Sequence, residues 1–61
     1  MDDRLNFNEI EIDMRVKDHD GDIGTVTRIE DINNIVVTYD NDGIGYICLE
    51  AGCCSDALYR L

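Results

Sequence analysis

Three aspartates at alternating positions are the first residues of this sequence whose spacing could do chemistry. Asp18, Asp20 and Asp22 stand together in a glycine-containing segment, and carboxylate oxygens are ligands that Ca²⁺ prefers. An EF-hand loop counted from Asp18 needs glycine at its sixth position and glutamate at its twelfth. The sequence has isoleucine at both positions. We therefore interpret the aspartates as turn-forming residues, with a weak cation site as the alternative, and predict no metal site.

Thiols and one imidazole form a second candidate site. Cys48, Cys53, Cys54 and His19 supply enough atoms for a Cys₃His zinc centre. Zinc ligands usually come in pairs two to four residues apart, and the adjacency of Cys53 and Cys54 does not suit that geometry. Small buried hydrophobic side chains are the preferred interpretation. A cysteine nucleophile with His19 as base would lack an orienting third group, so we predict no catalytic residue, no cofactor and no enzymatic activity.

The acidic residues share a further property, because they fall in or beside expected turns. Loops gather at the ends of a small barrel, where clustered carboxylates can imitate a row of phosphates and attract a basic protein. Among the tyrosines, Tyr46 is the best binding candidate because the neighbouring Gly45 would let a ligand approach. Ordinary packing is the alternative for every tyrosine. The residues predicted to bind a protein partner are Asp18, Asp20, Asp22, Glu30, Asp31, Asp40, Asp42 and Tyr46.

Net charge restricts the class of partner. The chain has 14 Asp and Glu against 5 Lys and Arg, a formal charge of −9. Binding to phosphates requires Lys and Arg to displace counterions, so this composition disfavours nucleic acid and anionic lipid. It favours encounter with basic proteins, and simple solubility is the alternative reading.

Length sets a second limit. Sixty-one residues allow a single domain, predicted to span residues 1–61. The side chains that would line a deep substrate cavity are needed to fill its small core. No segment resembles a signal peptide or reaches the roughly 18 apolar residues of a membrane span, so we expect a cytoplasmic location with reduced thiols.

The elements that must position these residues are predicted to be strands joined by tight turns. Residues 10–16 alternate apolar and charged side chains, which is typical of a half-buried strand. Asp13 could break the run, so that the first barrel strand starts at Met14. Residues 1–12 would then be an N-terminal extension or an extra strand. The exposed edge from 5 to 12 could pair with a second copy, so we expect a monomer or a weak dimer.

The next hairpin is marked by glycines. Residues 18–22 form a turn, because Asp-Gly provides the positive φ that a tight reversal needs. Residues 23–29 form a strand in which Gly24 marks a bend or a close backbone approach. The spacing of its apolar residues predicts a bulge near Thr27 and Arg28.

The rest of the chain repeats this pattern. Ile44 and Tyr46 are expected to share one face of their strand. The remaining predicted elements are a turn at 30–34, a strand at 35–39, a turn at 40–43, a strand at 44–49, a short helical turn at 50–56 and a last strand at 57–61. The fold class is therefore all-β.

A family resemblance follows from the segment after the first turn. Gly24-Thr25-Val26-Thr27-Arg28-Ile29 resembles the G-x-V-x-x-I pattern of the KOW motif, with Val36 to Tyr39 similar to the motif's next strand. The resemblance covers residues 14–61 and implies a five-stranded SH3-like barrel of the KOW and Tudor kind. It also implies binding to nucleic acid, ribosomes or RNA polymerase, whereas the loops here carry aspartate in place of the family's Lys and Arg.

These observations predict a non-enzymatic module that binds a basic protein through its acidic loops. In size and charge the chain is similar to small acidic proteins of bacterial viruses that block host proteins binding DNA or RNA. The module would then inhibit or modulate a nucleic-acid-processing machine, as a phage or bacterial regulator. The alternatives are a KOW-type direct binder of nucleic acid, ribosomes or RNA polymerase, and an accessory structural subunit.

Overall fold

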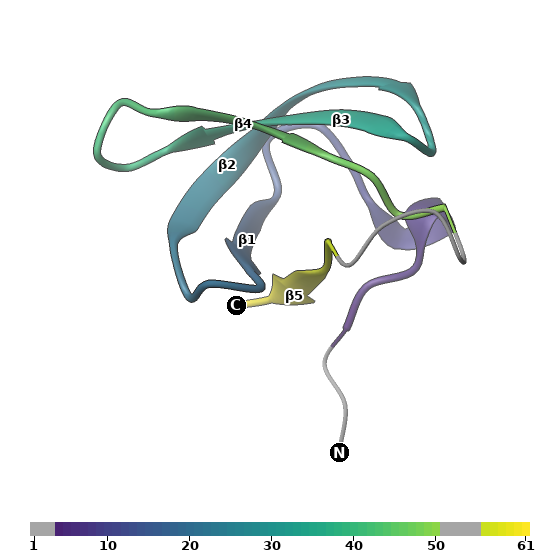
Figure 1. Ribbon diagram of the computed structural model, residues 1–61, viewed down its shortest axis with the longest axis horizontal. Coiled ribbons are helices and arrows are strands. Elements are labelled where there is room, and N and C mark those ends of the chain that lie inside the picture. Colours follow the sequence, from purple (N-terminus) through teal and green to yellow (C-terminus); the bar gives the residue numbers. More distant parts are fainter. Residues whose placement is uncertain (1–3, 51–55) are drawn as a thin grey trace.

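The computed structural model describes residues 4–50 and 56–61, and this part of the chain forms one antiparallel sheet. Its strands lie in the order β4-β3-β2-β1-β5. The sheet is strongly curved and partly encloses its concave side (Figure 1). The prediction of an all-β architecture is confirmed. The elements in chain order are the 3-10 turn η1 (Phe7–Glu9) and the strands β1 (Arg15–Asp18), β2 (Ile23–Asp31), β3 (Asn34–Tyr39), β4 (Ile44–Ile47) and β5 (Leu58–Arg60).

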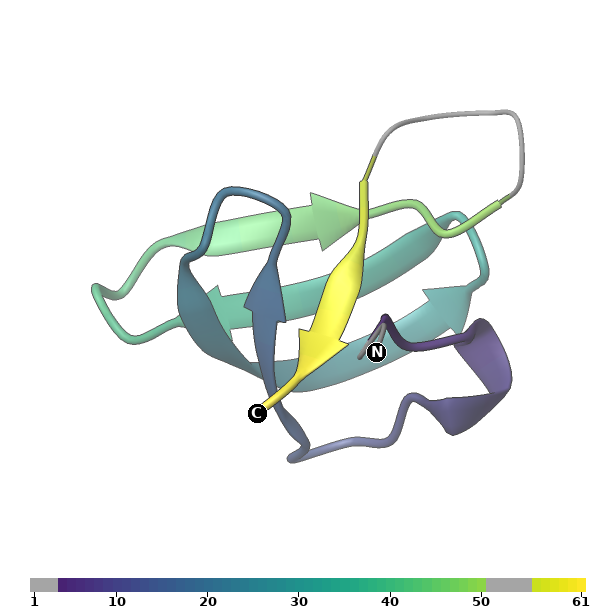
Figure 2. The same ribbon diagram turned by 90° about the horizontal axis from the view of Figure 1, so that it is seen from below.

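The sheet is not closed into the predicted barrel. In the part of the chain that the structure describes, β4 and β5 are the two ends of the strand order and do not pair. One reason is that the N-terminal segment occupies the second edge of β5 (Figure 2). The N–H of Leu5 donates to the Leu58 carbonyl at 2.8 Å, and Arg4 forms a bridge with Tyr59. Extended backbone from residues 4–5 thus takes the place that a closing strand would need.

The predicted strand over residues 10–16 is wrong in its first half. The segment 5–12, expected as an edge strand, instead contains η1, whose start is fixed by the N–H of Asn6 donating to the Glu9 carboxylate at 2.8 Å. Asp13 then adopts a left-handed conformation with φ of 72°, and its N–H donates to Val26 at 2.8 Å. A left-handed residue cannot continue a strand, so β1 begins only at Arg15. The alternative expectation that Asp13 breaks the run is thus confirmed, with the strand starting one residue after Met14.

The pairing of β2 with β3 confirms the predicted bulge, but the turn between these strands is shorter than predicted. Pairing shifts between Val26 and Arg28, as expected from the spacing of apolar residues in this strand. The turn predicted at 30–34 is shorter, because β2 continues to Asp31 and β3 already begins at Asn34. The last strand is confirmed as β5, while the helical turn predicted at 50–56 lies almost wholly outside the described residues.

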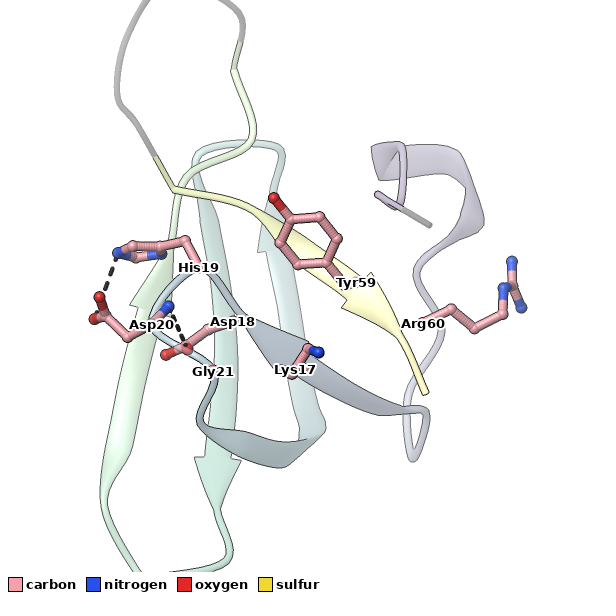
Figure 3. A pocket seen from close by; sticks show the side chains of 7 residues that line it. All are labelled: Lys17, Asp18, His19, Asp20, Gly21, Tyr59 and Arg60. Carbon is pink, nitrogen blue, oxygen red and sulfur yellow. Dashed lines mark hydrogen bonds and ion pairs between the residues drawn. The ribbon is translucent and has the colours of Figure 1, made fainter. Parts of the chain in front are cut away.

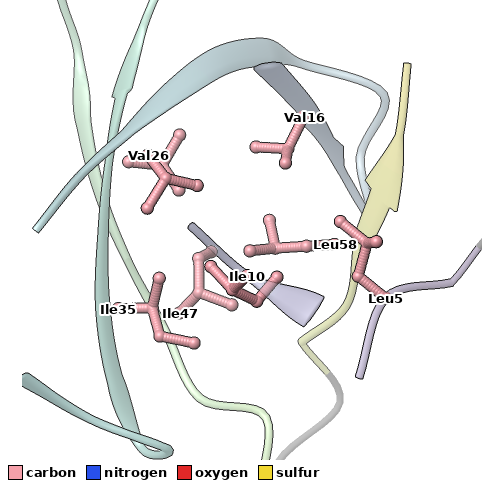
Figure 4. Packing of buried hydrophobic residues seen from close by; sticks show 8 residues of the cluster. Leu5, Ile10, Val16, Val26, Ile35, Ile47 and Leu58 are labelled. Carbon is pink, nitrogen blue, oxygen red and sulfur yellow. The ribbon is translucent and has the colours of Figure 1, made fainter. Parts of the chain in front are cut away.

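The core fills the concave side of the curled sheet. Side chains from all five strands meet there with two from the N-terminal segment, so that segment belongs to the core (Figure 4). The buried cluster is Leu5, Ile10, Val16, Val26, Ile35, Val37, Ile47 and Leu58. Gly24 is required where β2 meets β3, because a Cβ there would lie 2.7 Å from the Thr38 carbonyl oxygen. This close approach confirms the expectation for Gly24.

Candidate functional site

Two of the predicted acidic turns meet at one end of the sheet. The β1–β2 turn (residues 19–22) and the β3–β4 turn (residues 40–43) are joined by a hydrogen bond from the N–H of Asp40 to the Ile23 carbonyl at 3.0 Å. We call Asp18 and these two turns the acidic end. Glu30 and Asp31 lie in the last two residues of β2, at the opposite end of the sheet. The acidic end thus gathers the predicted aspartates except Asp31.

Asp18 anchors the acidic end from inside. Its side chain is buried, with the residue 5% exposed. One carboxylate oxygen accepts the N–H groups of Asp20 and Asp22 at 2.9 Å each, and the other accepts the Tyr39 hydroxyl at 2.8 Å. The turn reverses at Gly21, whose φ is +90°. Both oxygens of the Asp18 carboxylate therefore bind groups of the protein itself. Asp18 contributes to binding only indirectly, because it fixes the conformation of the turn.

The hydrogen bond between Asp18 and Tyr39 shifts the pKa values of both side chains. Burial opposes ionisation of Asp18, but the hydrogen bonds from the Tyr39 hydroxyl and from two backbone N–H groups outweigh it, so the pKa of Asp18 lies below its usual value. Burial, the hydrogen bond to Asp18 and the charges of the nearby aspartates raise the pKa of Tyr39 far above its usual value. Tyr39 therefore serves as a permanent donor that links the two turns.

Asp40 is also held by a partner within the molecule. Arg15 donates to both of its carboxylate oxygens at 2.7 Å and to the Thr25 hydroxyl at 2.9 Å. The hydrogen bond from Arg15 is the main cause that lowers the pKa of Asp40. Because its charge is already paired with a guanidinium, Asp40 contributes less to an external partner than the other aspartates of the turns.

Three exposed carboxylates remain at the acidic end. Asp20, Asp22 and Asp42 are exposed, and no lysine or arginine in the described ranges forms an ion pair with any of them. His19 lies 3.6 Å from Asp20 and would form an ion pair with it only when protonated. At the acidic end, these three aspartates are the members of the predicted binding set that are available to a partner.

A hollow of about 310 Å³ separates the two turns. The exposed Ile23 provides an apolar surface within it, with Asp22 and Asp40 among its other walls. The remaining lining residues are Gly21, Tyr39 and Asn41. A lysine or arginine side chain combines an apolar stem with a charged head, so its stem suits Ile23 and its head suits the carboxylates.

A second hollow lies on the other side of the β1–β2 turn (Figure 3). It has a volume of about 430 Å³ and is open to solvent. Lys17 and Arg60 contribute to its walls together with Asp18 and Asp20, so both signs of charge are present. This mixture makes the second hollow less suited to a cation than the space between the turns.

The aspartates of the β1–β2 turn could approach a metal ion together. Ligand atoms of Asp18, Asp20 and Asp22 lie within 4.8 Å of one another. Both oxygens of Asp18 already accept hydrogen bonds from the protein. The geometry is that of an aspartate turn, and we assign no metal to it. Of the proposed zinc ligands, Cys48 is half-buried and His19 exposed, while Cys53 and Cys54 lie outside the described residues.

Tyr46 is on the surface, but the reason given for choosing it was wrong. The side chain is 70% exposed on the outer face of β4, beside Ile44 at 59%. The space next to Gly45 belongs to Tyr39, because a Cβ at Gly45 would lie 2.6 Å from the Tyr39 ring and hydroxyl. The glycine thus admits a tyrosine of the same molecule. Exposure, shared with Ile44 as expected from strand alternation, is what supports Tyr46.

Three residues that contact or support the acidic end were missed in the sequence analysis. Tyr39 links the turns, Arg15 pairs with Asp40, and Ile23 contributes to the hollow between the turns. A signal for Tyr39 was present, since Gly45 lies two residues beyond the β3–β4 turn and a glycine in a strand often marks a neighbour that needs room.

Comparisons with protein families, with curated proteins and with solved structures find no match to this chain. The described residues contain no helix that is long and apolar enough to cross a membrane. The candidate site therefore rests on the geometry of this molecule alone.

Proposed function

We propose that this protein is a non-enzymatic binding module whose acidic end engages a basic segment of another protein. The observation that carries the proposal is the exposure of Asp20, Asp22 and Asp42, from two adjacent turns, without a lysine or arginine partner in the described part of the chain. Carboxylates left unpaired at one end of a molecule of charge −9 produce a local negative potential. Such a potential attracts cationic side chains and accelerates their encounter.

The hollow between the turns provides a surface that fits a lysine or arginine side chain. Its exposed Ile23 can cover the methylene stem of a lysine or arginine, and Asp22 stands within reach of the charged head. Asp18 and Tyr39 hold both turns in place, so little ordering entropy is lost when a partner binds. The binding surface is preformed, which favours recognition of a protein segment over adventitious charge attraction.

Basic segments are common in proteins that bind nucleic acid, because they neutralise phosphates. A module that covers such a segment would compete with the nucleic acid for it. We therefore propose modulation of a nucleic-acid-processing machine as the consequence of binding. The similarity of residues 24–29 to the KOW motif supports an SH3-like relationship at the level of the fold, and the acidic turns support a protein as the ligand.

An affinity capture from a bacterial lysate tests this function. The immobilised protein is compared with a turn variant that carries Asp20→Asn, Asp22→Asn and Asp42→Asn, and retained proteins are identified by mass spectrometry. These substitutions keep side-chain size, and asparagine tolerates the left-handed conformation of Asp42. Asp18 and Asp40 are left unchanged because they hold the turns.

A control variant with the same change in net charge shows whether binding depends on where the carboxylates lie or only on how many there are. It carries Glu11→Gln, Asp13→Asn and Glu50→Gln, all exposed and away from the acidic end. We expect basic proteins to be retained by the wild type and the control variant and lost by the turn variant. Equal retention by the turn variant would overturn the proposal. A shift of labelled DNA or RNA by the protein alone at low salt would favour the direct nucleic-acid binder instead.

A further inference from the structure

β4 is an edge strand with one side that no described strand covers. It stands at the end of the order β4-β3-β2-β1-β5 and pairs only with β3. The opposite edge of the sheet differs, because residues Arg4 and Leu5 bind along β5. An uncovered edge presents backbone N–H and C=O groups that can pair with another extended chain.

The hydrogen bonds of the hairpin identify the groups that face outward. The N–H of Tyr39 donates to the Gly43 carbonyl at 2.7 Å. Backbone pairing alternates along an antiparallel ladder, so Gly45 also directs its backbone groups toward β3. Ile44 and Tyr46 then direct their N–H and C=O groups away from the sheet.

The open edge is short. The N–H of Cys48, which is next in the outward series, donates to the Asp56 carboxylate at 3.1 Å. Two outward-facing residues, Ile44 and Tyr46, span roughly 7 Å and can pair with a strand of about three to four residues. The edge therefore suits a short peptide segment rather than a long strand.

Side chains and charge indicate what such a segment would be. Ile44 and Tyr46 are exposed on one face and would lie beside alternate side chains of an added strand. Asp42 precedes Ile44 by two residues, so one end of the segment would lie beside the acidic end. A second copy of this chain would bring a charge of −9 against −9, which opposes pairing of two β4 strands.

We propose that the basic segment of the partner binds as an added strand along the outer edge of β4, with apolar side chains beside Ile44 and Tyr46 and a lysine or arginine at the acidic end. This inference rests on the proposed function and specifies its mode of recognition. Backbone hydrogen bonds supply strength that does not depend on sequence, while the alternate side chains and the acidic end supply selectivity.

Two labelled peptides of equal charge test the added strand. One alternates lysine and valine over about ten residues, and the other alternates lysine and proline. Proline has no N–H to donate when it takes the place of the apolar residue opposite Ile44 or Tyr46. Fluorescence anisotropy measures their affinities. We expect the lysine–valine peptide to bind the wild type roughly tenfold more tightly, the effect of one or two backbone hydrogen bonds.

Variants at Tyr46 separate its backbone from its side chain. Tyr46→Pro removes an outward-facing N–H and leaves the pairing with β3 intact, whereas Tyr46→Thr removes only the aromatic ring. The preference for the lysine–valine peptide should be lost in Tyr46→Pro and largely kept in Tyr46→Thr. An unchanged preference in Tyr46→Pro overturns the added strand. The turn variant, by contrast, should weaken both peptides, and if it binds both as tightly as the wild type the proposed function itself fails.

Amide hydrogen exchange of the wild type gives a readout that requires no substitution at the edge. The amides of Ile44 and Tyr46 should become roughly tenfold better protected when the lysine–valine peptide is added. Exchange that the peptide leaves unchanged at both amides contradicts the proposal. Protection without peptide that grows with protein concentration would show a second copy on β4 and would also overturn it.

Discussion

At the scale of single residues, the hydrogen bond between Tyr39 and Asp18 organises the acidic end. It joins the end of β3 to the end of β1 over 2.8 Å. The bond is charge-assisted and largely shielded from water, so it is stronger than a bond between neutral groups on the surface. The room for the Tyr39 ring is provided by Gly45 on the neighbouring strand. Three residues from three strands thus determine the position of two turns.

Tyr39→Phe should lower the free energy of unfolding by about 2 kcal/mol, because it leaves the buried Asp18 carboxylate without one of its donors. Urea denaturation followed by circular dichroism measures the effect. Tyr46→Phe is the control, since that hydroxyl belongs to an exposed side chain and its loss should change stability by no more than about 0.5 kcal/mol. Equal stability of Tyr39→Phe and wild type would show that the bond does not hold the turns.

Asp18 predicts a specific dependence of stability on pH. Its pKa is lower in the folded protein than in the unfolded chain, where an aspartate titrates near about 3.9. Its ionised form therefore stabilises the fold above that value, and the contribution is lost as the pH falls through the lower, folded pKa. We expect the stability difference between wild type and Asp18→Asn to be largest near neutral pH.

The measurement is thermal unfolding of both proteins from neutral to strongly acid pH. Taking the difference removes the general effect of acid on a chain of charge −9, which both proteins share apart from one carboxylate. The difference in stability should shrink steadily below about pH 4. A difference that stays constant across this range would contradict the assignment of an ionised, buried Asp18.

At the scale of elements, the β3–β4 hairpin carries one of the two turns of the acidic end together with the open edge. Its turn closes with the N–H of Asp42 donating to the Tyr39 carbonyl at 3.0 Å, followed by the bond from Tyr39 to Gly43. The left-handed residue is Asp42, with φ of 72°, although Gly43 follows directly in the sequence. A charged residue thus occupies a position that glycine would fill with less strain, and its carboxylate is exposed.

Asp42→Gly should stabilise the fold by about 0.5 kcal/mol, because the relief of left-handed strain exceeds the entropy that glycine adds to the unfolded chain. The same substitution should weaken binding of the lysine–valine peptide. Asp42→Asn separates the two effects, since it keeps the left-handed tolerance but removes the charge. Denaturation and anisotropy on the three proteins provide the test. A destabilised Asp42→Gly would contradict the assigned turn.

Elements also show how far the sequence can be interpreted without a structure. Turn residues and β-branched runs predicted the strands from β2 to β4, and the spacing of Val26 and Ile29 predicted the bulge between Val26 and Arg28. The N-terminal segment was not predictable in the same way, because alternation at 10–16 is equally compatible with a strand and with a turn that places a left-handed residue at Asp13. The 3-10 turn η1 lies before this run. The conformation of the N-terminal segment depends on tertiary pairing with Leu58, which local patterns do not contain.

The candidate site divides in the same manner. The aspartates and the turns that carry them were visible as types and spacings. Which carboxylates face solvent was not, because the burial of Asp18 and the pairing of Asp40 depend on Tyr39 and Arg15, which are 21 and 25 residues away in sequence. Long-range contacts of this kind determine whether an acidic residue stabilises the fold or binds a partner.

At the scale of the whole molecule, charge and topology act together. The carboxylates behind the net charge of −9 have different roles. Some accept hydrogen bonds or form ion pairs within the fold, and others are exposed on adjacent turns. Next to those turns, the outer edge of β4 is not covered by any strand of the described residues. A basic segment could therefore be attracted by charge and aligned by the backbone of β4. The charge attraction and the backbone pairing come from different residues, so a substitution can remove one and leave the other.

The most direct test of the account is the affinity of the lysine–valine peptide for the wild type, the turn variant and the charge-matched control variant, measured by anisotropy at about 50 and 200 mM NaCl, where screening differs substantially. We predict that the turn variant binds at least about tenfold more weakly at low salt, that the control variant stays within about twofold of the wild type, and that the gap narrows at high salt. Equal weakening of the two variants would mean that only net charge matters, and would contradict a binding site at the acidic end.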